Sequence, residues 1–257
     1  MAVRHFDGFT DYLQVSGGAI GGNYNKAKAS SILAVIEPRQ KNTGADCALM
    51  TVLVGSSSKE AMFLPSAGTT DLQWGDDDPG NSTNAVLYDF PLNAWYIMAF
   101  TKASGSATFR AHMYAIALTT WHRNDSASSV SDAASGTAID TVTWGAFTPG
   151  VGHNMYRLAV AAVWNGTQLS DAQLNTVASA LSTQSVYALS PNALWEFNQA
   201  SVGTSVTDLM GGGANQKGIS GTSVVTGDDP TWTFGLGAPE IDHDFPKLPK
   251  KLMMGRP

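Results

Sequence analysis

The sequence has little charge, almost no cysteine and no long apolar run, and each shortage excludes a class of protein. Charged residues make up 14% of the 257 residues and hydrophobic residues 43%, which is the wrong balance for a disordered chain. The longest apolar runs, such as Ala159–Trp164, are too short to span a bilayer. The net charge is -6 and no series of basic residues is suited to follow a phosphate backbone, which disfavours a nucleic-acid partner. We therefore expect one large folded domain, or two small ones, with no nucleic-acid partner and no membrane insertion.

The single cysteine, Cys47, lies within an apolar run and cannot form a disulfide inside the chain. The N-terminal residues Met1–Asp7 lack the hydrophobic core of a secretory signal. Matches to the glycosylation sequon at Asn81, Asn124 and Asn165 carry little weight without such a signal. We expect the chain to fold in a reducing cytoplasm, wherever it acts afterwards.

Short apolar runs recur between turn residues along most of the chain, which is typical of β-structure. Two longer runs, Trp95–Thr101 and Thr108–Leu118, flank the loop Ala103–Ser106 and predict a hairpin. Within the second run, apolar and polar residues alternate, as they do in a strand with one face on the core. These runs predict an all-β protein.

One helix is predicted near residues 170–182. Ser170 and Gln173 have the spacing of a capping box. Apolar residues then recur with helical spacing at Leu174, Val177, Ala178 and Leu181. We expect the apolar face of this helix to lie on the end or side of a β-sandwich.

Many short strands with a single helix predict a two-sheet antiparallel sandwich over residues 1–238. Residues 183–238 either complete this sandwich or form a small appended unit, and the lack of a long linker before them favours completion. Residues 239–257 contain four prolines, an acidic start and a basic end, so they cannot form a core alone. We expect an extended C-terminal tail that docks on a partner through Phe245, Pro246, Leu248, Lys250, Lys251 and Leu252.

Three stretches resemble laminin-G-like domains in order and spacing. Phe6–Val15 resembles their opening motif, Asn93–Phe100 their central strand, and Leu158–Gln173 their closing strand with the sequence that follows it. The resemblance covers roughly residues 3–181. It implies a concanavalin A-like jelly roll of two antiparallel sheets.

The start Met1–Gly8 and the segments Leu194–Asn198 and Asp208–Gly213 also resemble laminin-G-like proteins encoded in tailed-phage structural operons. This resemblance implies a non-enzymatic virion protein, either a minor tail protein or a capsid decoration, on the virion surface after folding in the bacterial host cytoplasm. The implied partners are other virion proteins, further copies of the chain around a symmetry axis, and host-surface glycans.

The same fold hosts glycoside hydrolases, which need two carboxylates about 5–10 Å apart. The glutamates Glu37, Glu60, Glu196 and Glu240 are far apart in sequence and match no Glu-x-Asp-x-x-Glu pattern. The sequence also has no nucleophile elbow, no zinc-protease motif and no Walker loop, and its five histidines lack metal-ligand spacing. We therefore expect that the protein is not an enzyme. A carbohydrate-binding module is the first alternative and a glycoside hydrolase the second.

Asp76, Asp77 and Asp78 form the densest group of carboxylates, and calcium takes oxygen ligands from loops. The laminin-G-like family often binds calcium at the rim of the sandwich, so these residues are the candidate calcium site. The alternative is a solvated turn between Gly75 and Pro79.

Three of the seven tryptophans, Trp74, Trp121 and Trp144, lie at the ends of predicted strands or in loops. An exposed aromatic ring there would serve as a platform for a sugar. Trp95 and Trp164 lie inside predicted strands, where core packing is expected. Trp74, Trp121 and Trp144 are therefore the candidate glycan-binding residues.

Overall fold

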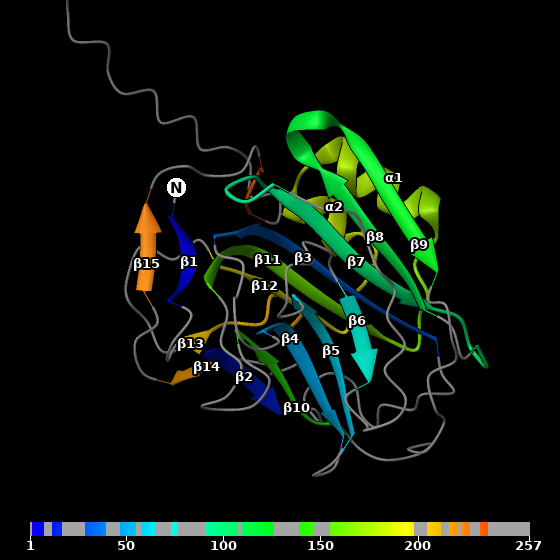
Figure 1. Cartoon of the computed structure of the whole chain (residues 1–257), viewed down its shortest axis with the longest axis horizontal. Helices are drawn as coiled ribbons and strands as arrows, with labels where there is room; N and C mark the ends of the chain where they lie inside the picture. The colour runs from blue at the N-terminus through cyan, green and yellow to red at the C-terminus, as the bar shows by residue number, and fades with distance from the viewer. Residues whose placement is uncertain are drawn as a thin grey trace, which may run out of the picture.

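Two antiparallel β-sheets lie face to face in the computed structural model and make up most of the protein (Figure 1). The structure describes residues 2–7, 12–16, 29–39, 47–54, 58–64, 73–76, 91–106, 109–125, 139–145, 155–197, 205–211, 216–219, 223–226 and 232–235.

Sheet A has the strand order β15-β1-β11-β3-β7-β8-β9. The long strand β11 pairs along one edge with β3, and shares its other edge between β1 and β12. The strands of sheet A are β1 (Ala2–Asp7), β3 (Ser30–Pro38), β7 (Tyr96–Lys102), β8 (Phe109–Ala115), β9 (Thr120–Asp125), β11 (Met155–Asn165), β12 (Ala193–Glu196) and β15 (Ser223–Thr226).

Sheet B has the order β13-β14-β2-β10-β4-β5-β6. Its strands are β2 (Tyr12–Ser16), β4 (Cys47–Val54), β5 (Ser58–Leu64), β6 (Gln73–Asp76), β10 (Ile139–Trp144), β13 (Ser205–Val206) and β14 (Gln216–Ile219). Going along the chain, β1 lies in sheet A, β2 in sheet B, β3 in sheet A and β4 to β6 in sheet B. This repeated crossing makes strands from the two ends of the chain neighbours, and the fold is a jelly-roll sandwich, as the sequence predicts.

The first hydrophobic core fills the space between the sheets. Phe6 on β1 stacks on Tyr156 of β11, with ring centroids 4.6 Å apart. From sheet B, Leu13 and Trp144 enter the same core and are 0% and 1% exposed. Burying a large apolar side chain of this kind stabilises the fold by about 1.5–3 kcal/mol.

A bulge in β11 changes which of its side chains face that core. The register against β3 shifts between Leu158 and Val160, which leaves Ala159 as the extra residue. Before the bulge the even-numbered side chains point into the core between the sheets, and after it the odd-numbered ones do. Val160 and Trp164 consequently lie on the outer face of sheet A.

Two helices, α1 (Asp171–Ala180) and α2 (Thr183–Tyr187), cover part of the outer face of sheet A (Figure 1). All nine residues of β3 are buried, because this strand lies between two apolar layers. On α1 the buried side chains are Leu174, Val177 and Ala178, which confirms the predicted apolar face. The helix packs across the flat of the sheet, whereas the sequence placed it on the end or side of the sandwich.

Several elements were not predicted from the sequence, among them a 3-10 turn, the strand after it and a second helix. The second strand of the predicted hairpin ends at Ala115, and a 3-10 turn, η2 (Ile116–Leu118), leads into the strand β9. Thr119 makes this reversal in the left-handed region, with φ 52°. The short helix α2 follows α1 after Leu181, which is also left-handed, with φ 45°.

The segment after residue 182 supplies strands to both sheets. β12 and β15 lie in sheet A, and β13 and β14 in sheet B. The predicted tail, residues 239–257, lies outside the described residues. Among the residues that are described, no helix is long and apolar enough to cross a membrane.

Candidate functional site

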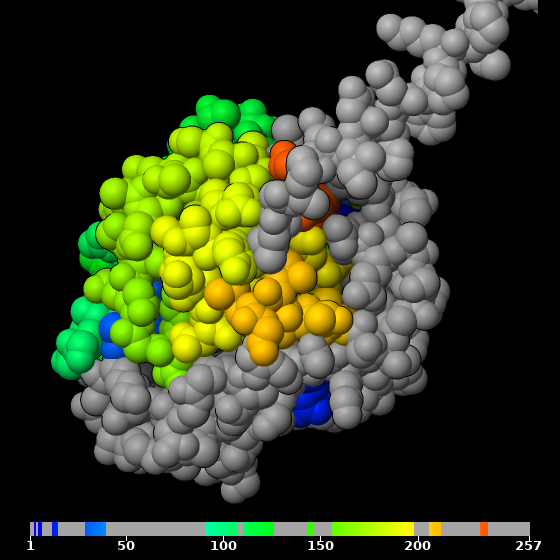
Figure 2. All heavy atoms as spheres, turned by 180° about the vertical axis from the view of Figure 1, so that it is seen from behind, coloured from blue at the N-terminus to red at the C-terminus, as the bar shows by residue number. Residues whose placement is uncertain are grey.

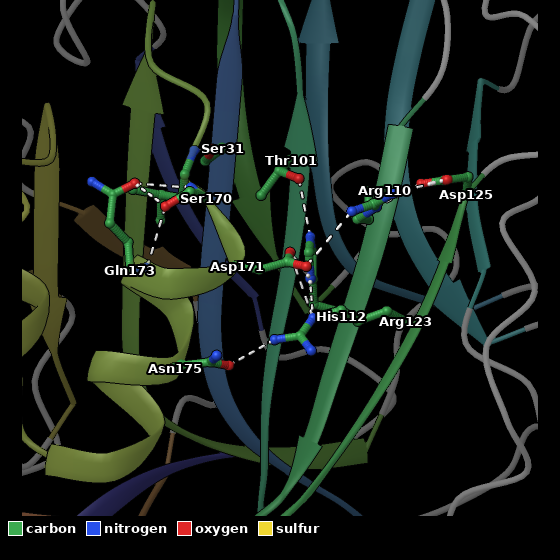
Figure 3. A network of polar contacts seen from close by, with 11 residues as sticks. Ser31, Thr101, Arg110, His112, Arg123, Asp125, Ser170, Asp171, Gln173 and Asn175 are labelled. Carbon is green, nitrogen blue, oxygen red and sulfur yellow. Dashed lines mark hydrogen bonds and ion pairs between the residues drawn. The ribbon is translucent and has the colours of Figure 1, made fainter.

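Polar side chains from β7, β8, β9 and α1 gather on the outer face of sheet A (Figure 3). The register of β8 and β9 places three pairs of residues opposite each other: Arg110 with Asp125, His112 with Arg123, and Tyr114 with Trp121. Because the side chains of a strand alternate, the intervening residues of β8 face the core between the sheets. We call the polar group the outer-face cluster; it consists of Thr101, Arg110, His112, Arg123, Asp125, Asp171 and Asn175.

His112 is the buried centre of the cluster, with 0% of its surface exposed. Arg123 donates from Nε to His112 Nδ1 at 3.3 Å, and Thr101 Oγ1 lies 3.0 Å from His112 Nε2. A guanidinium only donates, so Nδ1 accepts, and we assign the ring proton to Nε2, which then donates to Thr101. The pKa of His112 is lowered from 6.5 to about 4, chiefly by burial and also by the Arg123 and Arg110 charges, against the opposing effect of Asp171 and Asp125. His112 is therefore uncharged at neutral pH.

Asp171 joins the helix to the sheet. It is the first residue of α1, and its carboxylate lies 3.6 Å from Arg123 Nε and 3.7 Å from both Arg110 Nη1 and His112 Nδ1. A carboxylate in the first turn also interacts favourably with the helix dipole. These contacts connect the N-terminus of the helix to β8 and β9.

Arg110 and Asp125 form a two-pronged pair across β8 and β9. Nε lies 2.7 Å from Oδ1, and Nη2 lies 3.1 Å from Oδ2. The hydrogen bond and the opposite charge of Asp125 raise the pKa of Arg110, and Arg110 lowers the pKa of Asp125. Both side chains are well exposed, so the pair contributes about 0–1 kcal/mol to stability.

Arg123 connects the cluster to both the helix and an aromatic ring. Its Nη2 donates to Asn175 Oδ1 at 2.8 Å, one turn into α1. Its guanidinium carbon lies 4.6 Å from the centroid of the Trp121 ring, in cation–π geometry. Trp121 also contacts Tyr114, at 5.0 Å between centroids. Three elements therefore meet at one guanidinium.

The start of α1 is fixed by two further contacts, which Figure 3 also shows. Ser170 Oγ accepts from Gln173 N at 3.3 Å and Gln173 Oε1 accepts from Ser170 N at 2.8 Å, which confirms the predicted capping box. Ser31 of β3 accepts from Leu169 N at 2.8 Å and donates to Thr167 O at 3.0 Å. The chain that leads into α1 is thereby bonded to the middle of sheet A.

A second polar group lies on the same outer face, around Glu37 at the end of β3. This carboxylate is 3% exposed and lies 2.8 Å from Arg39 Nε and 3.4 Å from Arg157 Nη1. Arg39 also donates to Asn93 Oδ1 at 3.3 Å. A buried carboxylate is tolerated only when it is paired in this way. We assign these residues a structural role.

The chemistry of the outer-face cluster suits attachment more than catalysis. Both ring nitrogens of His112 are engaged, and Asp125 is held ionised by Arg110. A general acid of a glycoside hydrolase needs the opposite, a carboxyl with a raised pKa. Within the described ranges, no group of three His, Cys, Asp or Glu residues could hold a metal ion.

The three candidate glycan-binding tryptophans differ in where the structure places them. Trp144 is 1% exposed in the core between the sheets, so its predicted role as an exposed sugar platform is wrong. Its position at the end of β10 hid the fact that it faces inward. Trp121 is half-buried on β9, with Arg123 over its ring, and its glycan role stays a prediction. Trp74 lies on β6, and nothing further tests its role.

The candidate calcium site and the docking tail fall mostly outside the described residues. Asp76 ends β6, whereas Asp77 and Asp78 follow it beyond the described part. The tail residues Phe245, Pro246, Leu248, Lys250, Lys251 and Leu252 also lie there. Both sites stay predictions.

Sequence reasoning did not find the outer-face cluster. The alternation of Arg110, His112 and Tyr114 showed that these residues share one face of a strand. It did not show that Asp171, far along the chain, lies against that face. The only local signal was a carboxylate directly after the cap residue Ser170.

No protein-family model matches the sequence, and no curated protein matches it. Among solved structures, a native heptameric SAP-like pentraxin from Limulus polyphemus is 15% identical, with a TM-score of 0.45 over 70% of this chain and 82% of that one. The LG1-3 region of the laminin alpha2 chain is 12% identical, with a TM-score of 0.47 over 66% of this chain and 32% of that one. The enzymatically active domain of bacteriophage CBA120 tailspike protein 2 is 12% identical, with a TM-score of 0.42 over 62% of this chain and 24% of that one. At these identities the similarities assign no activity and no ligand to this chain.

Proposed function

We propose that this protein is a non-enzymatic structural component of a tailed-bacteriophage virion, either a minor tail protein or a capsid decoration. It folds in the host cytoplasm and then displays its jelly-roll sandwich on the particle surface, in several copies and in contact with other virion proteins. The resemblance of Met1–Gly8, Leu194–Asn198 and Asp208–Gly213 to proteins of phage structural operons supports this origin.

One observation carries the non-enzymatic part of the proposal. In the outer-face cluster, the histidine, both arginines and both aspartates contact one another and attach α1 to sheet A. The histidine is buried and uncharged, so it is not poised to exchange a proton with a bound molecule. Residues that an enzyme would use for acid–base chemistry serve here to stabilise a scaffold.

Carbohydrate binding is the second candidate, and Trp121 favours it. Its ring is half-buried beside Arg123, and the exposed side chains of Arg110 and Asp125 lie further along the same pair of strands. Aromatic rings flanked by hydrogen-bonding groups recognise sugars. A virion protein with this property would attach the particle to host glycans, so the two candidate functions are compatible.

The test is association with particles. Phage particles are banded in a density gradient, and the chain is quantified by mass spectrometry against the major capsid protein. We expect the chain to band with the particles at a fixed ratio, while a host cytoplasmic protein does not. Recovery of the chain only in the soluble fraction would contradict the proposal.

A truncated chain tests the docking tail. Deletion of Pro239–Pro257 is expected to abolish incorporation into particles while the thermal unfolding of the purified sandwich stays unchanged. Normal incorporation of the truncated chain would show that the tail does not dock the protein on the particle. A glycan array, read with and without calcium, tests carbohydrate binding, and an array with no signal in either condition would exclude it.

A further inference from the structure

The Nδ1 atom of His112 has two competing neighbours (Figure 3). Arg123 Nε lies 3.3 Å from it and donates, and Asp171 Oδ1 lies 3.7 Å from the same nitrogen. A guanidinium only donates and a carboxylate only accepts, so the protonation of Nδ1 decides which of the two can bond to it. Unprotonated Nδ1 selects Arg123, and protonated Nδ1 selects Asp171.

The other ring nitrogen of His112 keeps its partner in both protonation states. Nε2 lies 3.0 Å from Thr101 Oγ1, and a hydroxyl oxygen accepts from Nε2 whether or not Nδ1 also carries a proton. Thr101 is 2% exposed on the neighbouring strand β7, so this contact holds the ring in place. The imidazole can therefore change its partner at Nδ1 without leaving its site.

The charges that face His112 are balanced only while the ring is neutral. They are two cations and two carboxylates: Arg110 from the same strand, Arg123 and Asp125 from β9, and Asp171 from α1. A proton on the ring adds a third cation beside the Arg123 guanidinium, and like charges so close together repel strongly in a site shielded from water. Arg123 is the group with room to move, because its side chain is 26% exposed whereas His112 is fully buried.

We propose that His112 is an acid-operated switch that exchanges Arg123 for Asp171 at Nδ1. The ring takes a proton from solvent at Nδ1, donates it to the Asp171 carboxylate and loses its bond to Arg123. The exchange occurs only in acid, because burial and the neighbouring arginines lower the pKa of His112 to about 4. The helix α1 stays attached throughout, through the new bond to Asp171 and through its buried apolar side chains.

The exchange also changes the surroundings of Trp121. The Arg123 guanidinium carbon lies 4.6 Å from the centroid of this half-buried ring, and the His112 ring meets it edge-on at 6.2 Å. Seen from behind, green atoms of residues 109–125 reach the molecular surface beside the yellow-green atoms of the helices (Figure 2). Movement of the guanidinium away from His112 therefore takes a cation off an aromatic ring at the edge of the sheet. This inference concerns the outer-face cluster and depends neither on the virion assignment nor on glycan binding.

The experiment is an NMR titration of the isotope-labelled full chain from pH 7 to about pH 3, with circular dichroism at each pH to follow the fold. The nitrogen shift of His112 Nδ1 reports its protonation, and the Nε–H signal of Arg123 reports its bond to the ring. We expect the Arg123 signal and the indole N–H signal of Trp121 to change with the same midpoint as Nδ1. In His112→Leu, neither signal should show a change at that midpoint.

Two variants of α1 separate the exchange of partners from protonation alone. Asp171→Asn removes the carboxylate that accepts from protonated Nδ1 and is expected to lower the midpoint by about one pH unit, a tenfold loss of proton affinity. Asn175→Ala is the matched control, because it removes the other α1 side chain that contacts Arg123 and keeps Asp171, and it should not lower the midpoint.

Three results would overturn the proposal. The first is an Asp171→Asn midpoint equal to that of the unmodified chain. The second is an Arg123 signal that stays unchanged while His112 Nδ1 takes up its proton. The third, in the unmodified chain, is loss of the circular dichroism signal at the midpoint of Nδ1, because acid would then unfold the protein and not exchange a partner within it.

Discussion

Arg123 donates a hydrogen bond from Nε to Nδ1 of His112, across the paired strands β8 and β9. The bond fixes the tautomer of a fully buried imidazole and directs its remaining proton at Thr101. The same guanidinium contacts Asp171 and Asn175 of α1. One partly buried arginine therefore adds polar contacts between α1 and sheet A to the apolar packing of Leu174, Val177 and Ala178.

The first prediction compares the two arginines of the outer-face cluster. Arg123→Ala leaves Nδ1 of buried His112 without its donor and is expected to lower the free energy of unfolding by about 1–3 kcal/mol. Arg110→Ala removes an exposed pair with Asp125 and is expected to cost less than about 1 kcal/mol. Urea unfolding at pH 7 measures both. Equal losses would contradict the central position of Arg123.

The second prediction concerns pH. The pKa of folded His112 is about 4, below the ordinary value of 6.5, so the unfolded chain binds more protons between these two values. The free energy of unfolding is therefore highest above about pH 6.5, and it decreases as the pH falls toward 4. The gap corresponds to about 3 kcal/mol of unfolding free energy.

The control for the pH prediction is His112→Leu, which cannot titrate. Urea unfolding of both proteins between pH 7 and pH 4 gives the difference in unfolding free energy at each pH. That difference is expected to change in favour of the variant as the pH falls, by about 3 kcal/mol across the range. Parallel curves would show that His112 is not held neutral in the folded protein.

The third prediction tests the N-terminus of α1. Ser170→Ala removes the side chain that accepts from Gln173 N, and loss of such a cap costs about 1 kcal/mol. Ser179→Ala is the matched control, because its hydroxyl only donates back to a carbonyl of the same helix. Thermal unfolding should show a lower midpoint for Ser170→Ala alone. A similar midpoint for both variants would mean that tertiary contacts, and not the cap, fix this end of the helix.

The features that the sequence predicted are those with local causes. A capping box links Ser170 to Gln173 three residues later, so both partners can be recognised on the sequence. The alternation in β8 shows directly which residues face the core. The uninterrupted apolar run of β3 also carried a signal, since a strand buried on both faces implies a layer outside the sheet. That signal would have placed the helix on the flat of sheet A.

The features that were missed depend on distant partners. β9 reads Thr-Trp-His-Arg-Asn-Asp, a polar segment with little strand character. It forms because it pairs with β8, and its last residue, Asp125, contacts Arg110. Trp144 was expected to be exposed because it ends a strand. Its side chain instead points toward sheet A, into the core between the sheets. Contacts of this kind appear only when the register and the two sheets are known.

The last prediction concerns the segment after residue 182, for which the sequence left two possibilities open. Asp208 is 4% exposed, and its Oδ1 accepts from Leu194 N at 3.1 Å and from Met210 N at 3.0 Å. β12 in turn pairs with β11 in the middle of sheet A. If this segment completes the sandwich, it must unfold together with the rest of the chain.

We therefore expect one unfolding transition, with the same midpoint by tryptophan fluorescence and by far-ultraviolet circular dichroism. Asp208→Ala leaves one buried and one partly buried backbone donor without their acceptor and is expected to lower the free energy of that transition by about 1–3 kcal/mol without splitting it. Asp125→Ala removes an exposed carboxylate and is expected to cost less than about 1 kcal/mol. A separate early transition in Asp208→Ala would instead mark the segment as an appended unit, because only an independent unit can unfold while the remaining strands of both sheets stay paired.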